Sequence, residues 1–200
     1  MGVSTYHFYL VPPCSFCYEF TIRVPVMILV YAALSVFVLV VNYIAGNHAM
    51  RVAHRTLRSP NEGLPDVLHT ILPRIHILVP DIAMVCSLIA SLFFIDQEIY
   101  YLGWDRVLVS FLVRPVFVCA TTLPSPLPAE LHFWCQTHDL MFSGHTILFL
   151  AVARLFYANN YILAGLFVGF WGPLLLVAAR QHYTIDILVA GSVFLATANM

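Results

Sequence analysis

The stretch VPVMILVYAALSVFVLVVNYIA, residues 24–45, decides the class of fold because it carries no charged side chain. A helix that crosses the hydrocarbon core of a bilayer needs about 20 predominantly apolar residues. The stretch is too long for the apolar core of a signal peptide, and no small-residue cleavage site follows it. It therefore predicts a membrane-spanning helix, preceded by a short N-terminal segment over residues 1–23.

The composition agrees with a membrane protein. Of 200 residues, 61% are hydrophobic and 10% are charged, whereas a soluble domain carries about 25% charged residues. Such hydrophobicity excludes a disordered chain. Nine basic residues stand against ten acidic ones, for a net charge of −1, which argues against a nucleic-acid partner. We expect an all-α integral membrane protein.

Five further apolar runs follow the first. They cover residues 75–95, 107–123, 143–157, 162–179 and 183–199. Backbone groups in lipid must be satisfied within the chain, and these runs do not alternate as barrel strands do, so they predict helices. We expect one membrane domain of six spans over residues 1–200. Six spans place the first, third and fifth loops, where polar sequence is concentrated, on one face.

Two polar clusters lie at the edges of predicted spans on that face. They are HDLMFSGHT, residues 138–146, and RQHYTID, residues 180–186. Ionisable residues at or within a membrane are costly to place there, so both clusters are candidates for a functional site.

The second cluster contains a histidine and a carboxylate at helical spacing. His182 and Asp186 are four residues apart, so on a helix they share one face. A carboxylate at that distance holds one ring nitrogen of the histidine and leaves the other as nucleophile or base. A structural hydrogen bond would give the same spacing.

The first cluster has the features of a helix start that binds an anion. Ser143 is a favoured N-cap, and Gly144 permits close approach of a ligand to the backbone. His145 would then protonate a leaving oxygen. Together with His182 and nearby arginines, this set favours phosphoryl transfer through a histidine, without a metal or cofactor. Two histidines and two carboxylates are also a plausible metal ligand set, but no His-x-x-x-His or Glu-x-x-His spacing supports it.

The two clusters together resemble the sphingomyelin synthases and wider sphingolipid synthases, which are relatives of the type 2 phosphatidic acid phosphatases. SGHT at residues 143–146 and HYTID at 182–186 carry the likeness. GLPD at residues 63–66 and Arg114 with TTLPSP at 121–126 resemble two further motifs of that family, in family order.

The chain departs from the family in several places. THD at residues 137–139 stands where the family has Cys-Gly-Asp, and Gly63 replaces a proline. The phosphatase pattern Ser-Arg-x5-His is absent, since Leu176 lies six residues before His182. That absence favours the synthase branch.

The resemblance implies a transferase that moves a phospho-head group from a glycerophospholipid to ceramide and releases diacylglycerol. Phosphocholine or phosphoethanolamine is the expected head group, and an inositol donor stays open. His145, His182 and Asp186 match the family's catalytic residues. His182 would be the nucleophile oriented by Asp186, and His145 the general acid and then the general base.

Other residues are candidates for substrate binding. Asp139 would either help to position His145 or bind a cationic head group. Phe142 and Tyr183 would contact that head group through cation–π interactions, although packing explains the two aromatics as well. Arg180 would contact phosphate. Arg114 lies within a span and would either pair with Asp81 or face phosphate.

Three questions stay open at this level. A lipid phosphatase or phospholipase-C-like hydrolase would use the same triad, and a non-catalytic scaffold or channel would need none of it. A homo-oligomer is also possible. The excess of arginine on the site face would place it in the cytoplasm, whereas the resemblance places it in the lumen or outside, at the Golgi or plasma membrane, and we follow the resemblance.

Overall fold

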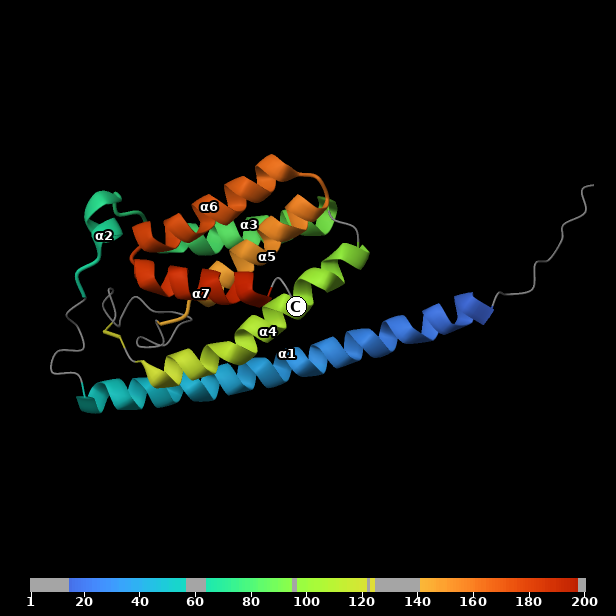
Figure 1. The fold of residues 1–200 in the computed structure, drawn as a ribbon, viewed down its shortest axis with the longest axis horizontal. Coiled ribbons are helices and arrows are strands. Elements are labelled where there is room, and N and C mark those ends of the chain that lie inside the picture. The colour runs from blue at the N-terminus through green and yellow to red at the C-terminus, as the bar shows by residue number, and fades with distance from the viewer. Residues whose placement is uncertain (1–14, 57–63, 95–96, 122, 125–140, 198–200) are drawn as a thin grey trace, which may run out of the picture. The chain divides into compact units, whose positions relative to one another are not determined.

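The computed structural model describes residues 15–56, 64–94, 97–121, 123–124 and 141–197, which contain seven helices and no strand (Figure 1). The helices are α1 (Ser15–Thr56), α2 (Val67–Ile71), α3 (Leu78–Phe94), α4 (Gln97–Ala120), α5 (Gly144–Ala158), α6 (Ile162–Ala178) and α7 (Thr184–Thr197). The predicted all-helical class is confirmed for these residues.

Each predicted apolar run coincides with a helix, but two helices extend beyond their runs. α1 begins at Ser15 and ends at Thr56, and α4 begins at Gln97. Polar and charged side chains are compatible with helix, so apolar length alone underestimates helix length. Pro115 and Pro173 lie inside α4 and α6 without ending them.

One helix is long and apolar enough to cross a membrane, judged by length and composition over the described residues. It covers Leu29–Val52 within α1. The apolar helices α3, α5, α6 and α7 have 17 residues or fewer. The count of six spans therefore stays a prediction.

The chain divides into two compact units, residues 1–37 and 38–200. In the first unit, the helical side chains Leu29, Val36 and Phe37 are exposed. Ser35 Oγ donates a hydrogen bond to the Tyr31 carbonyl one turn earlier, at 2.7 Å. All residues of the candidate site lie in the second unit, to which the following paragraphs refer.

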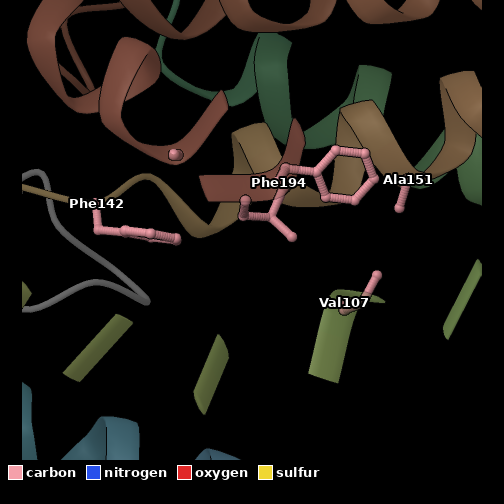
Figure 2. Packing of buried hydrophobic residues seen from close by; sticks show 6 residues of the cluster. Val107, Phe142, Ala151 and Phe194 are labelled. Carbon is pink, nitrogen blue, oxygen red and sulfur yellow. The ribbon is translucent and has the colours of Figure 1, made fainter. Parts of the chain in front are cut away.

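α5 lies at the centre of the second unit. It packs against α3, α4, α6 and α7. Figure 2 shows Phe194 of α7 beside Ala151 of α5, with Val107 of α4 facing them. Phe142, which precedes α5, belongs to the same buried cluster. The start of α5 is thereby fixed by packing on several helices.

α5 and α6 approach closely through glycine. A Cβ at Gly172 would lie 2.4 Å from the Phe149 ring, and one at Gly165 would lie 2.7 Å from the Ala153 carbonyl oxygen. Small residues allow such approach of helices in an apolar environment. This contact aligns the end of α6 with the start of α5, where the two polar clusters meet.

Candidate active site

Ser143 begins α5 as the sequence predicts. Its backbone is extended, and its buried hydroxyl accepts a hydrogen bond from the Thr146 amide at 3.2 Å. The next residue, Gly144, has little free space: a Cβ there would lie 3.1 Å from the Phe111 ring. This N-cap places His145 in the first turn of α5.

A turn after α6 brings the second cluster to the same place. The Gln181 amide donates to the Leu176 carbonyl and the Arg180 amide to the Val177 carbonyl, both at 3.0 Å. Arg180 has a φ of 61°, so the pattern is a Schellman motif with arginine at the position that glycine usually takes. The turn leads directly to His182 and α7.

His182 and Asp186 form a buried pair. His182 Nδ1 lies 3.3 Å from Asp186 Oδ2, as their spacing predicts, and the exposed fractions of the residues are 6% and 0%. With Asp186 ionised, its carboxylate only accepts, which places the proton on Nδ1 and leaves Nε2 without it. The same Oδ2 accepts the Tyr183 amide at 2.8 Å. Asp186 therefore fixes both the ring and the adjoining backbone.

His145 pairs with Asp81, for which the sequence had suggested Arg114 as a partner. His145 Nε2 lies 3.1 Å from Asp81 Oδ1, and these side chains are 21% and 33% exposed. The ring centroids of His145 and His182 are 6.4 Å apart. The site thus contains two histidine–carboxylate pairs that face each other. The signal for Asp81 was present, because a carboxylate inside an apolar run requires a partner.

Arg114 makes different contacts from those considered in the sequence. Its Nε donates to the Phe142 carbonyl at 3.1 Å, and a terminal nitrogen donates to Asn42 Oδ1 at 2.9 Å. Asp81 is paired with His145, and the Arg114–Asp81 alternative stays a prediction. Arg114 secures the residue that precedes the α5 N-cap. A contact from Arg114 to phosphate stays a prediction.

The guanidinium of Arg180 faces backbone carbonyls. It donates to the carbonyl oxygens of His69, Leu72 and Val177, the last two at 3.2 Å. These bonds tie the turn after α6 to α2. The predicted phosphate contact of Arg180 is untested, and the observed contacts give this residue a structural role.

The other predicted substrate contacts differ in their surroundings. Phe142 is fully buried, with its ring centroid 5.7 Å from that of Phe117, which agrees with the packing interpretation. Tyr183 is buried as well, and its hydroxyl donates to the Pro124 carbonyl and accepts from the Leu64 amide, both at 2.8 Å. Asp139 lies outside the described residues.

The first-loop motif contacts the segment between α6 and α7, which the sequence did not reveal. Asp66 Oδ2 accepts the Thr184 amide and Oδ1 accepts the Thr184 hydroxyl, both at 2.7 Å. Burial alone would raise the pKa of the Asp66 carboxyl, but hydrogen bonds from Thr184 and His69 outweigh it and hold that pKa below its ordinary value. Asp66 is therefore ionised at neutral pH.

Within the described residues, no group of three or more histidine, cysteine or acidic side chains is arranged to hold a metal ion. The expectation of a site without metal or cofactor remains a prediction.

Comparison with known proteins gives one family. Residues 136–198 match the profile PAP2_C, described as PAP2 superfamily C-terminal. No curated protein matches the chain. The matched segment includes His145, His182 and Asp186, and it supports a relation to the type 2 phosphatidic acid phosphatases.

The match also supports coarser features of function. It supports an activity of the lipid phosphatase or phosphotransferase type, acting on lipid substrates, in a superfamily whose proteins are commonly membrane-associated.

Proposed function

We propose that this protein is a membrane-embedded sphingolipid synthase. It would transfer a phospho-head group from a glycerophospholipid to the primary hydroxyl of ceramide and release diacylglycerol. The observation that carries the proposal is the pair of histidines, each held by its own carboxylate, whose ring centroids are 6.4 Å apart. Ceramide is proposed as the acceptor because the motifs resemble those of the sphingolipid synthases.

In the first step, His182 Nε2 attacks the phosphorus of the donor phosphodiester. The phosphorus–nitrogen bond forms as the bond to the glycerol oxygen breaks, and His145 gives that oxygen a proton. Diacylglycerol leaves, and the head-group phosphate stays on His182. Asp186 Oδ1 is buried without a hydrogen-bond partner among the described residues. The negative charge of Asp186 therefore stabilises the His182 ring most strongly when the bond to phosphorus makes that ring cationic.

In the second step, the ceramide hydroxyl oxygen displaces His182 from phosphorus. His145, now neutral, takes the hydroxyl proton as the oxygen attacks phosphorus, and the phosphorus–nitrogen bond breaks. His182 returns to its neutral state and His145 to its protonated state. Because Asp81 holds Nε2 of His145, Nδ1 is the nitrogen that exchanges the proton.

The N-terminus of α5 is a suitable position for the phosphate. The amides at the start of a helix favour an anion. Arg114 contributes positive charge beside the same turn. Asp139, Phe142, Tyr183 and Arg180 remain predicted contacts to head group or phosphate, and the negative charge of Asp139 favours a choline or ethanolamine donor.

We place the site at the lumenal or outer face of a Golgi or plasma membrane, on the strength of the resemblance. Accessibility of a cysteine introduced at Asn61, in the first loop, tests this side of the membrane.

The acceptor distinguishes the transferase from a hydrolase. With water in place of ceramide, the same two steps yield a phosphorylated head group, and the family match supports this reaction equally well. The test supplies purified protein with labelled ceramide and phosphatidylcholine, phosphatidylethanolamine or phosphatidylinositol. A labelled phosphosphingolipid that is absent with His182→Ala supports the transferase.

Two other results would redirect the proposal. Release of the phospho-head group without consumption of ceramide identifies a hydrolase. No turnover with any donor favours a scaffold that retains the fold.

A further inference from the structure

We infer that Asp66 is a positioning residue for the nucleophile: its carboxylate holds the turn between α6 and α7 so that His182 faces His145. This inference rests on the proposed function, because it assigns Asp66 a part in the same reaction. Asp66 does not touch the His182 ring, and it acts through the backbone that carries it.

The contact between Asp66 and Thr184 is the centre of this arrangement. Each carboxylate oxygen accepts from Thr184, one from the amide and one from the hydroxyl, both at 2.7 Å. Asp66 Oδ1 also accepts the His69 amide at 3.2 Å, which begins α2. One carboxylate therefore joins the first turn of α7 to α2, which lies beside the end of α6 (Figure 1).

Further bonds between the first loop and the turn surround this contact. His69 Nε2 lies 3.0 Å from the His182 carbonyl, to which it donates as a carbonyl only accepts. Arg180 donates to the carbonyls of His69 and Leu72. The Leu64 amide donates to the Tyr183 hydroxyl at 2.8 Å. We call the four residues that make these bonds, Leu64, Asp66, His69 and Leu72, the first-loop clamp.

The first-loop clamp acts on both sides of His182. Its bonds reach residue 182 itself, the turn before it and Thr184 after it, whereas Asp186 holds the ring from within α7. A turn that is held only from within α7 would leave the backbone of His182 able to shift. Displacement of a reacting group by about 1 Å costs on the order of 100-fold in rate, so these bonds bear directly on catalysis.

The test compares Asp66→Asn and Thr184→Val with a matched threonine variant. An asparagine at position 66 keeps the α2 cap but cannot accept both Thr184 bonds, because its amide nitrogen is a donor. Thr184→Val removes the hydroxyl bond alone, and Thr184→Ser retains it. Thr70→Val is the control, since the Thr70 hydroxyl donates to the Val67 carbonyl within α2, at 2.6 Å.

We expect Asp66→Asn to lower kcat about 10- to 100-fold and Thr184→Val to lower it less, with KM within about twofold of the wild type. Thr184→Ser and Thr70→Val should retain wild-type kcat. In Asp66→Asn/Thr184→Val, the loss should exceed that of Asp66→Asn alone, because Asp66→Asn removes the acceptor of the Thr184 amide and Thr184→Val removes the hydroxyl bond. Equal kcat in Asp66→Asn and Thr70→Val overturns the positioning role.

Hydrogen–deuterium exchange tests the clamp without reference to activity. We expect the Thr184 amide to exchange at least about tenfold faster in Asp66→Asn and unchanged in Thr70→Val. Unchanged exchange in Asp66→Asn contradicts the clamp. A wild-type protein inactive with every donor overturns the proposed function and the catalytic role of Asp66 with it, while the exchange rate still decides whether the clamp exists.

Discussion

The two histidine–carboxylate pairs differ in how they are held. His182 and Asp186 are buried, lie one turn apart in sequence, and are surrounded by bonds to the first loop. His145 and Asp81 come from different helices and are partly exposed. A nucleophile must keep one orientation through two displacements, whereas a proton donor must exchange its proton. The difference in burial matches these two tasks.

The largest effect should separate the two histidines. We expect His182→Ala to lower kcat by at least about 10⁴-fold, because the covalent path is lost. His145→Ala should lower it by about 10²- to 10⁴-fold, the range of general acid–base catalysis. Initial rates of head-group transfer measure both.

His76→Ala is the matched control for these variants, since His76 is an exposed histidine outside the site, and its activity should stay within about twofold. A His145→Ala variant less active than His182→Ala would reverse the assigned roles.

Substitution of the two carboxylates should show the same order, with the larger loss of kcat on the His182 side. Asp186→Asn should lower kcat by about 10³- to 10⁴-fold, because asparagine reverses the ring tautomer of a buried histidine. Asp81→Asn should cost about tenfold, since water reaches that partly exposed pair and replaces the lost bond. Equal losses in steady-state kcat would show that burial does not distinguish the two pairs.

A smaller effect concerns the support of His145. Ser143→Ala removes the N-cap of α5 and should lower the free energy of unfolding by about 1 kcal/mol. Because His145 is in the first turn, kcat should fall several-fold as that turn loosens. Thermal unfolding in detergent and the transfer rate measure the two effects.

Ser143→Asn retains a capping side chain and should recover most of the lost stability. Full activity in Ser143→Ala would show that packing around Phe142 alone fixes the helix start.

The smallest effect is a pH dependence on the His182 side. The pKa of Asp66 is lowered in the folded protein, so its contribution to stability is present above the ordinary aspartate pKa of about 3.9 and is lost as pH falls through the folded-state value. The free energies of unfolding of wild type and Asp66→Asn, measured by thermal unfolding, should converge as the pH falls below about 4. At neutral pH they should differ by under about 1 kcal/mol, because Asp66 and Thr184 are partly exposed. A difference that persists at acidic pH would show that the carboxylate charge is not responsible.

The sequence predicts the helices well and the site in part. Apolar runs locate six of the helices, but α2 has five residues and lacks a periodic signal. The spacing of His182 and Asp186 and the serine at position 143 predict local geometry, because both depend on neighbours within one or two turns.

Contacts between distant segments are not visible in such spacing. Asp81 and His145 are brought together by the packing of α3 on α5. Asp66 reaches Thr184 because the Schellman turn at Arg180 redirects the chain towards the first loop. A polar residue in an apolar run indicates that a partner exists, and tertiary packing decides which one.

The central claim is a phosphoryl intermediate on His182. The most direct test incubates the protein with head-group-labelled donor lipid and no acceptor, stops the reaction in alkali, and digests it with trypsin. Cleavage after Arg154 and Arg180 places His145 and His182 on different peptides. We predict an acid-labile phospho-head-group adduct on the peptide that begins at Gln181. An adduct on the His145 peptide, or turnover with no adduct on either, would contradict the account.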